Sequence, residues 1–187
     1  LSEEQKEKDL LRFQVCKELY MTQNKNQVLG VILAGGLSRR MNGENKFLKM
    51  IQGKTLIGII VSKALMQVNK LIINANIVEK KIQQYNLPII KDSLSGFFGP
   101  LAGILAAMEY ANKKKIKWLL TVPCDAPFFP KDLTKKLLSH AIKRKKDIVI
   151  AKSGGRNHPV FGIWSTSLTK SLKTALKKKQ IRKMDVW

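Results

Sequence analysis

Two adjacent glycines followed by basic residues form the part of the sequence best suited to bind phosphate. The segment is Leu33-Ala34-Gly35-Gly36-Leu37-Ser38-Arg39-Arg40-Met41-Asn42-Gly43-Glu44-Asn45-Lys46. Glycines let backbone amide groups approach phosphate oxygens closely, and Arg39, Arg40 and Lys46 can offset phosphate charge. The spacing matches neither the Walker motif nor the dinucleotide fingerprint. The loop therefore predicts phosphate binding outside the common ATPase and dehydrogenase classes. The alternative is a tight turn with exposed basic residues.

A single carboxylate, Asp125, follows a later apolar run and is flanked by two prolines. The run Lys117–Val122 ends at Pro123, and Pro127 follows Asp125 closely. Prolines stiffen this turn, and a carboxylate here could hold Mg²⁺ against triphosphate oxygens. The alternative is an Asp that caps the next turn. We interpret Asp125 as the metal ligand because we expect it at the same sheet edge as the glycine loop.

Further polar residues and glycines follow other predicted strands. Asn74 and Asn76 could bind a base edge or ribose, and Asp92 could accept hydrogen bonds from ribose hydroxyls or a base amino group. Gly99 and Gly103 bracket a predicted helix start, where a base or ribose could lie against the backbone. Each alone is typical of turns or helix starts. Their convergence on one sheet edge favours a nucleotide site.

A second glycine pair, Gly154 and Gly155, precedes Arg156 and His158. These two side chains could receive a second, phosphorylated substrate from a loop. The alternative for His158 is an ordinary surface residue.

Short β-branched runs alternate with stretches of helical periodicity. The predicted strands are Val28–Leu33, Lys70–Asn74, Leu87–Lys91, Lys117–Val122, Asp147–Ala151 and Val160–Trp164. The predicted helices are Thr55–Val68, Val78–Tyr85, Leu101–Asn112, Lys131–Lys145 and Ser167–Lys179. Parallel strands need such crossovers, so we predict a three-layer α/β/α sandwich with a mostly parallel, Rossmann-like sheet. Its ligands should lie at the carboxyl ends of the strands.

The bulk composition fits one basic domain. The chain has 187 residues, 44% of them hydrophobic, and a formal net charge of +22. Of its 35 basic residues only six are Arg, whereas bidentate contacts with bases and phosphates favour Arg. A lysine-rich composition therefore explains the charge better than specific nucleic-acid binding, and it also suits a polyanionic small substrate. A non-catalytic RNA-binding module is the alternative from a different class.

Other sequence features bear on location and domain limits. No apolar run reaches the length of about 20 residues that a membrane-spanning helix needs, and we expect a soluble, cytoplasmic protein. Cys16 and Cys124 are far apart and indicate neither a disulfide scaffold nor a zinc site. Residues 1–27 are a polar extension of uncertain origin, with Met21 as a possible start or a short surface helix as the alternative. We place the catalytic domain at residues 28–187.

Taken in order, these motifs resemble the molybdenum cofactor guanylyltransferases, the molybdopterin-guanine dinucleotide biosynthesis protein A family of the nucleotidyltransferase class. The resemblance covers Val28 to Trp187. Its six motifs are Leu33-Ala34-Gly35-Gly36-x-Ser38-x-Arg40-Met41 with Lys46, Asn74-Ala75-Asn76, Asp92-Ser93, Gly99-Pro100-Leu101-Ala102-Gly103, Pro123-Cys124-Asp125-x-Pro127 and His158-Pro159-Val160.

The resemblance implies that the phosphate of molybdopterin attacks the α-phosphorus of Mg-GTP, releasing pyrophosphate and forming a guanine dinucleotide cofactor. The implied catalytic residues are Lys46, Arg40 and Asp125, with Asp125 on Mg²⁺. The predicted GTP-binding residues are Leu33, Ala34, Gly35, Gly36, Lys46, Asn74, Asp92, Gly99 and Asp125. Expected partners are GTP, molybdopterin or molybdenum-molybdopterin, and proteins that deliver or receive the cofactor. The motifs indicate no membrane partner and fix no oligomeric state.

Three departures from the family pattern stand out. Asn42 occupies a position usually held by Gly, although Asn tolerates left-handed backbone. Glu44-Asn45 replaces the commoner acidic residue directly before Lys46. Family members also continue beyond the equivalent of Trp187 into an Asn-x-Asn-Thr-Pro segment of the metal and nucleotide site, so we expect a domain truncated at its C-terminus.

Related enzymes that use CTP, or that act on sugar or polyol phosphates, are the nearest alternative. They typically carry Ala-Ala-Gly or Gly-x-Gly-Thr-Arg loops, whereas Ala34-Gly35-Gly36 with Ser38 and Arg40 favours the guanylyl reaction.

Overall fold

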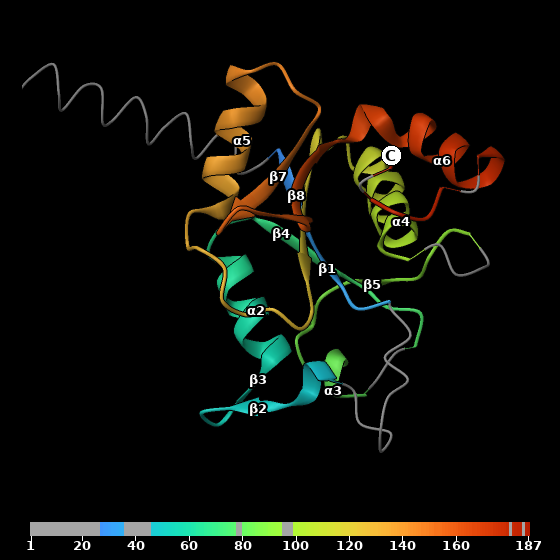
Figure 1. Cartoon of the computed structure of the whole chain (residues 1–187). Helices are drawn as coiled ribbons and strands as arrows, with labels where there is room; N and C mark the ends of the chain where they lie inside the picture. Colours follow the sequence, from blue (N-terminus) through green and yellow to red (C-terminus); the bar gives the residue numbers. More distant parts are fainter. Residues whose placement is uncertain (1–26, 36–45, 78–79, 95–98, 180, 185) are drawn as a thin grey trace, which may run out of the picture.

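The computed structural model describes residues 27–35, 46–77, 80–94, 99–179, 181–184 and 186–187, and its centre is a twisted β-sheet (Figure 1). Within these residues, six strands pair in the order β5-β4-β1-β6-β8-β7. The strands of this sheet are β1 (Val28–Leu33), β4 (Lys70–Asn74), β5 (Ile89–Ile90), β6 (Trp118–Pro123), β7 (Ile148–Ser153) and β8 (Arg156–Ser165). The pairs β1–β4, β1–β6 and β4–β5 are parallel, and β8 runs antiparallel to both of its neighbours.

Helices cover both faces of the sheet (Figure 1). The helices are η1 (Lys46–Leu48), α2 (Leu56–Leu65), α3 (Lys80–Gln83), α4 (Pro100–Lys113), α5 (Leu133–Lys143), η2 (Thr166–Leu168) and α6 (Thr169–Lys178). Alternate residues of β1 face opposite layers: Val28 and Ile32 pack with α2 and α5, whereas Leu29 and Val31 pack with α4 and α6. Because both faces are buried, β1 is apolar along its whole length apart from its glycine. The predicted three-layer α/β/α fold is confirmed.

The sequence missed two hairpins. A small one joins β2 (Met50–Ile51) to β3 (Lys54–Thr55), where Gln52 and Gly53 both have positive φ. The other joins β7 to β8. Its two turn residues, Gly154 and Gly155, have φ of 52° and 76°, as the tight turns of twisted hairpins require. The segment predicted as a loop before residue 160 is therefore the start of a longer strand, β8.

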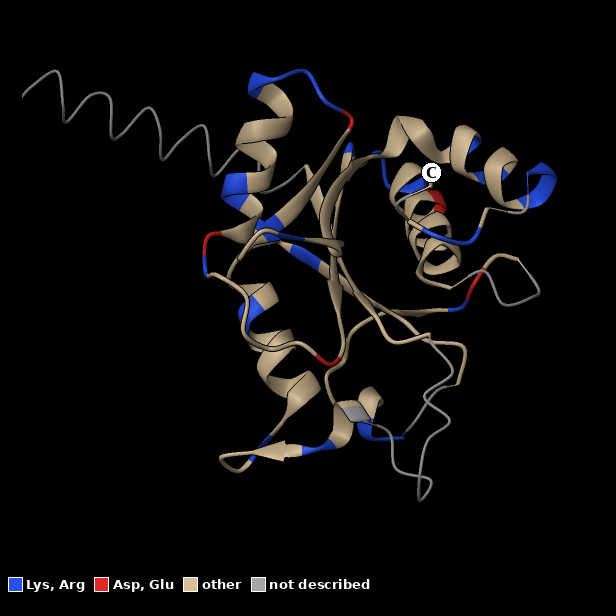
Figure 2. Ribbon diagram, viewed as in Figure 1, with Lys and Arg blue, Asp and Glu red and all other residues tan. Residues whose placement is uncertain are grey.

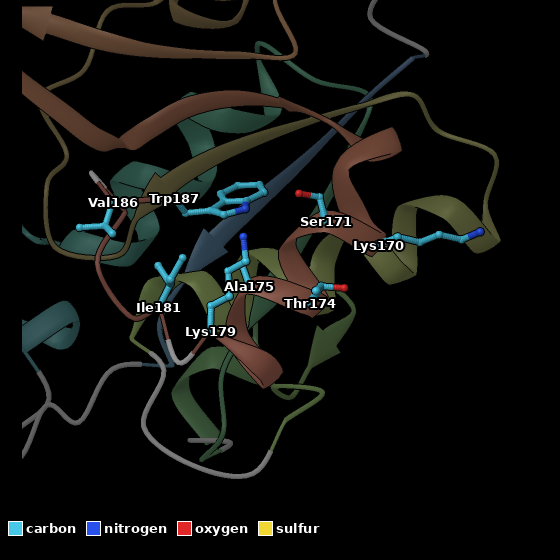
Figure 3. Close-up of a pocket in the computed structure, with 8 residues that line it drawn as sticks. All are labelled: Lys170, Ser171, Thr174, Ala175, Lys179, Ile181, Val186 and Trp187. Carbon is cyan, nitrogen blue, oxygen red and sulfur yellow. The ribbon is translucent and has the colours of Figure 1, made fainter.

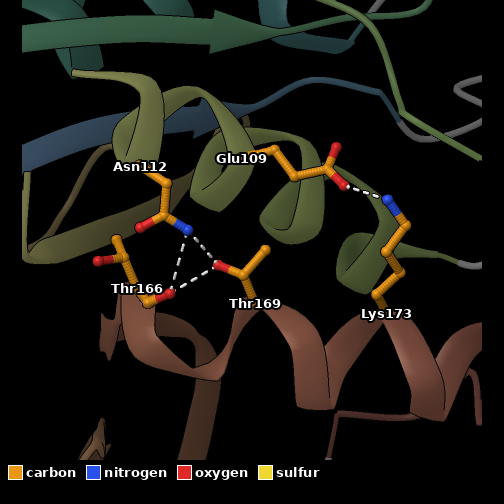
Figure 4. A network of polar contacts seen from close by, with 5 residues as sticks. All are labelled: Glu109, Asn112, Thr166, Thr169 and Lys173. Atoms are coloured by element: carbon orange, nitrogen blue, oxygen red, sulfur yellow. Dashed lines mark hydrogen bonds and ion pairs between the residues drawn. The ribbon is translucent and has the colours of Figure 1, made fainter. Parts of the chain in front are cut away.

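A polar network joins α4 to α6 (Figure 4). Lys173 Nζ lies 2.9 Å from Glu109 Oε1. One turn away, Asn112 Nδ2 donates to Thr169 Oγ1 at 2.8 Å and to the carbonyl oxygen of Thr166 at 3.3 Å. Partial burial raises the pKa of Glu109, but hydrogen bonds from Ser93 and Lys173 and the charges of Lys173 and Lys113 outweigh it, so the pKa is lowered overall. Glu109 therefore stabilises this contact in its ionised form.

We predict that Glu109→Gln lowers the free energy of unfolding at neutral pH by up to about 1 kcal/mol, because the pair is partly exposed. A lowered pKa stabilises the folded state above the ordinary value of 4.5, and this contribution is lost as the pH falls through the folded-state value. Urea unfolding should show the wild type and the variant converging at acidic pH. Lys173→Met should show the same loss at neutral pH. A Glu109→Gln difference that is equal at every pH would contradict this account.

The residues after α6 pack back onto the α4 and α6 side of the sheet. Trp187 stacks on Trp164 with ring centroids 5.8 Å apart and an angle of 16° between the rings, and Ile181 and Met184 join the same apolar cluster. Between this segment and α6 lies a pocket of about 480 Å³ (Figure 3). The described residues of this segment form neither strand nor helix.

Lys and Arg residues are spread over the helices, strands and loops and are far more numerous than Asp and Glu (Figure 2). The acidic residues of the described part are Asp92, Glu109, Asp125, Asp132 and Asp147. Two of them, Asp92 and Asp125, follow strands at the edge where the sequence predicts the nucleotide site. None of the helices in the described ranges has the length and hydrophobicity of a membrane-spanning segment.

Several predictions concern residues outside the described part. These are the N-terminal extension up to residue 26 and, in the glycine loop, Gly36 and Arg40. Lys46 begins η1, but its side chain is also outside the described part.

Candidate active site

The carboxyl ends of β4, β1 and β6 meet at one edge of the sheet. In the strand register, Leu33 pairs with Asn74 on one side and with Pro123 on the other. Backbone hydrogen bonds continue past the strands: Ala34 N donates to Asn74 O at 2.8 Å, and Cys124 N donates to Leu33 O at 3.3 Å. The structure therefore places the start of the glycine loop between Asn74 and the segment that leads to Asp125.

Asp92 is held at this edge by two asparagines. Asn74 Nδ2 donates to Asp92 Oδ1 at 3.0 Å, and Asn76 Nδ2 donates to Asp92 Oδ2 at 2.8 Å. Asn76 Oδ1 accepts from Asp92 N at 2.9 Å, and Asn76 Nδ2 also reaches Gly35 O at 3.4 Å. Asn76 thus links the glycine loop to Asp92. The orientation of the carboxylate is set before any ligand binds.

Asn74 is buried, whereas the sequence predicts that it contacts a base or ribose. Its side chain is 2% exposed, and its Nδ2 also donates to Ile90 O at 3.4 Å. Direct contact with a base or ribose needs an accessible amide, which Asn74 does not offer in this structure. We therefore propose that Asn74 contributes to nucleotide binding by fixing Asp92, which is partly exposed.

Gly35 and Gly103 leave room for Asn74. A Cβ atom on Gly35 would lie 2.9 Å from Asn74 Oδ1, and one on Gly103 would overlap with the same oxygen. Gly103 is buried in α4, so it serves this packing and does not present open backbone to a base. Gly99 is different: it is exposed, precedes the first turn of α4 and has φ of 61°, a left-handed value that favours glycine.

We predict that Gly103→Ala lowers the free energy of unfolding by about 1–3 kcal/mol, because the added methyl group overlaps with Asn74. Chemical denaturation should measure the loss. The same substitution in an Asn74→Ala background should cost clearly less, since Asn74 Oδ1 is then gone. Equal costs in the two backgrounds would show that Asn74 is not the obstacle.

Asp125 is exposed two residues beyond β6. Its neighbour Cys124 is partly buried, and burial together with the charge of Asp125 raises the pKa of the Cys124 thiol to about 12. A thiol with so high a pKa stays protonated at neutral pH and is a poor nucleophile. Of these two neighbours, the Asp125 carboxylate and not the Cys124 thiol is therefore the candidate for chemistry at this edge.

The carboxylates suit a magnesium ion that is held jointly with a substrate. No group of three or more His, Cys, Asp or Glu side chains that could hold a metal occurs among the described residues. Mg²⁺ does not need such a group, since one or two carboxylates and substrate phosphates commonly hold it. Asp125 fits this role because it is exposed, whereas both oxygens of Asp92 already accept amide hydrogen bonds.

Lys46 is anchored through the residues that follow it. Phe47, next in η1, is 5% exposed and packs in the α2 side of the core, where Leu48 also makes contact. The backbone at the end of the glycine loop is thus fixed to the domain.

The β7–β8 hairpin, which carries the candidate second-substrate residues Arg156 and His158, borders a pocket that the sequence did not predict. Ser153 Oγ and His158 Nε2 lie 2.8 Å apart across the hairpin. A pocket of about 580 Å³ separates the hairpin from α5, and Phe128, which is 83% exposed, lies at its border. The sequence signal was the Phe128-Phe129 pair between two prolines, three residues after Asp125. Arg156 is exposed next to the glycine turn.

A mostly parallel sheet with a glycine loop after its first strand and an exposed carboxylate after β6 is typical of nucleotidyltransferases. The family model described as MobA-like NTP transferase domain matches residues 30–185. The chain belongs to this family, and within it to the molybdenum cofactor guanylyltransferases. The resemblance derived from its motifs is thereby confirmed.

Individual relatives support this assignment. The molybdenum cofactor guanylyltransferase of Rhodopseudomonas palustris (strain HaA2) is 40% identical over 157 residues, which cover 83% of this chain and 73% of the relative. That of Pasteurella multocida (strain Pm70) is 42% identical over 142 residues, covering 76% of this chain and 74% of the relative.

Solved structures agree. Molybdopterin-guanine dinucleotide biosynthesis protein A from Archaeoglobus fulgidus superimposes with a TM-score of 0.67 and 26% identity, covering 85% of this chain and 77% of that one. A 4-diphosphocytidyl-2C-methyl-D-erythritol synthase shares the fold with a TM-score of 0.57 and 11% identity.

Proposed function

We propose that this chain transfers GMP from magnesium-bound GTP to the phosphate of molybdopterin, with pyrophosphate as the second product. The observation that carries the proposal is the convergence of the glycine loop, Asp92 and Asp125 on neighbouring strand ends of one sheet. Relatives named for this activity match most of the chain. We take molybdopterin, with or without molybdenum, as the acceptor, and proteins that supply or receive the cofactor as partners.

The reaction needs no nucleophile from the protein. The acceptor phosphate is already anionic and can attack the α-phosphorus in line as the bond to pyrophosphate breaks. The enzyme therefore acts by positioning the two substrates and by stabilising charge.

Each candidate residue has a distinct role in this proposal. Backbone groups of Leu33, Ala34, Gly35, Gly36 and Gly99 bind GTP, and Asp92, oriented by Asn74, accepts hydrogen bonds from it. Asp125 would hold Mg²⁺, which when bound would offset negative charge on the triphosphate and on the pyrophosphate leaving group. Lys46 and Arg40 add positive charge at the phosphates. The net positive charge of the chain attracts both polyanionic substrates.

A nucleotide panel tests the choice of GTP. Calorimetric titration of the purified chain with GTP, CTP, ATP and UTP, each with and without Mg²⁺, should show magnesium-dependent binding that is strongest for GTP. Stronger magnesium-dependent binding of CTP would overturn the guanylyl assignment and leave a related nucleotidyltransferase reaction. Salt-sensitive RNA binding that is indifferent to GTP and survives Asp125→Ala would overturn the enzyme assignment for this site.

A further inference from the structure

Helix α2 holds the segment that follows Asp125, and we propose that Lys63 is the positioning residue that sets Asp125 against the glycine loop. The inference deepens the proposed function and rests on it, because it assigns a role in the metal site to a residue outside that site. Lys63 lies in the last turn of α2, far from Asp125 in sequence. None of the motifs that define the candidate site includes it.

Asp125 lies in a short segment whose upstream end is fixed by a backbone hydrogen bond. The last backbone bond on that side joins Cys124 N to Leu33 O at 3.3 Å, which ties the end of β6 to the end of β1. Leu33 is the residue from which the glycine loop departs. The upstream side of Asp125 is therefore fixed relative to the phosphate-binding loop.

Lys63 supplies the anchor after Asp125. Its Nζ donates to Pro127 O at 2.9 Å and to Phe129 O at 3.1 Å. The same ammonium lies 5.2 Å from the centre of the Phe129 ring, within the range of a cation–π interaction. One side chain thus holds two carbonyl groups and one ring of the segment that leaves the site. Figure 1 shows this segment passing α2 between β6 and α5.

Gln67, which follows the end of α2, forms further hydrogen bonds with the segment that leads into α5. Its Nε2 donates to Pro130 O at 3.0 Å, and its Oε1 accepts from Thr134 N at 3.0 Å. Gln67 is 5% exposed, so these bonds form away from solvent. The pair Lys63 and Gln67 therefore fastens the chain from Pro127 to the first turn of α5.

Only Asp125 and Ala126 lie between the two anchored residues, Cys124 and Pro127. Proline fixes the φ angle of residue 127 and restricts the backbone of residue 126. Few backbone torsions are therefore free to compensate if Pro127 moves. Loss of the Lys63 bonds should move or loosen the Asp125 carboxylate. Groups hydrogen-bonded directly to metal ligands typically change metal affinity or activity by about 10–100-fold, and for an anchor that acts through the backbone we expect an effect at the lower end of this range.

The test compares Lys63→Met with Lys63→Arg and with the matched control Lys135→Met, which removes an exposed lysine of α5. We expect Lys63→Met to raise the Mg²⁺ concentration needed for half-maximal GMP transfer by about tenfold or more. The KM for GTP at saturating Mg²⁺ should change much less. Lys63→Arg should restore most of the response, because its guanidinium can donate to both carbonyls. The control should behave as the wild type.

A second readout keeps the two proposals separate. Calorimetric titration of Mn²⁺ into each variant saturated with GTP measures the metal site without turnover. A folded Lys63→Met protein with unchanged Mg²⁺ and Mn²⁺ responses would overturn the positioning role. A wild type that binds Mn²⁺ with GTP but makes no dinucleotide would overturn the proposed function instead, and weakened Mn²⁺ binding in Lys63→Met would still support the role of Lys63. If Lys63→Met fails to fold, Lys63→Gln is tested in the same way.

Discussion

Asp125→Ala should lower the rate of GMP transfer by about a hundredfold or more and leave the folded domain intact. The carboxylate is exposed beyond the end of β6, so its loss opens no cavity in the core. Its proposed task is to hold Mg²⁺ against the triphosphate, and groups that stabilise charge in a transition state commonly contribute at least this much. Steady-state release of pyrophosphate measures the rate, and circular dichroism melting measures the fold.

The matched control for this prediction is Asp147→Ala. Asp147 is exposed too, but it precedes β7 and so lies at the opposite, amino-terminal edge of the sheet. Its removal should leave the rate within about twofold, since an exposed charge so placed contributes little. Loss of the folded state in Asp125→Ala would make Asp125 a structural residue. A rate close to that of the wild type would remove it from the metal site.

Lys46→Ala should cause the other large loss, also about a hundredfold. The residue ends the glycine loop in the sequence, and in the proposed function its charge offsets that of the phosphates. Without it, charge developing during in-line displacement is less well stabilised. Single-turnover transfer at saturating Mg-GTP separates this effect from weaker binding of GTP.

Lys49→Ala is the control, since Lys49 is an exposed lysine only three residues away. It should keep its activity and differ only slightly in salt dependence. If both variants lose the same amount, a general effect of net charge explains the data and Lys46 has no special role. Lys46→Arg should retain part of the rate, because the charge is kept while the geometry of its donors changes.

The regular, fully buried elements were the easiest to predict. The bounds of β1 and β4 match the prediction, because each contains a run of buried apolar residues, interrupted in β1 by one glycine and flanked in β4 by Lys70 and Asn74. The predicted strand 87–91 contracts to Ile89–Ile90, a two-residue edge strand that pairs only with β4 among the described strands. The hydrophobic pattern of an edge strand is less regular, because such a strand pairs with a neighbour along only one of its two edges.

The sequence predicted which strand ends form the candidate site but not the contacts that hold its residues in place. The rule that strand ends converge brought Leu33, Asn74 and Pro123 together correctly. It could not show that Asn74 is buried beneath Asp92, since burial depends on Gly103 of α4, a residue distant in sequence. The hydrogen bond from Lys63 to the Pro127 carbonyl joins residues 64 positions apart, and no local sequence pattern predicts such a contact.

The central claim is that this edge of the sheet carries out guanylyl transfer. Its most direct test is to incubate the purified chain with Mg-GTP and molybdopterin and to quantify the molybdopterin-guanine dinucleotide and the pyrophosphate together. We predict that the two products form in equal amounts, that both require Mg²⁺ and the acceptor, and that neither forms when CTP replaces GTP. Dinucleotide made faster from CTP, or GTP bound in the presence of Mg²⁺ without either product, would contradict the account.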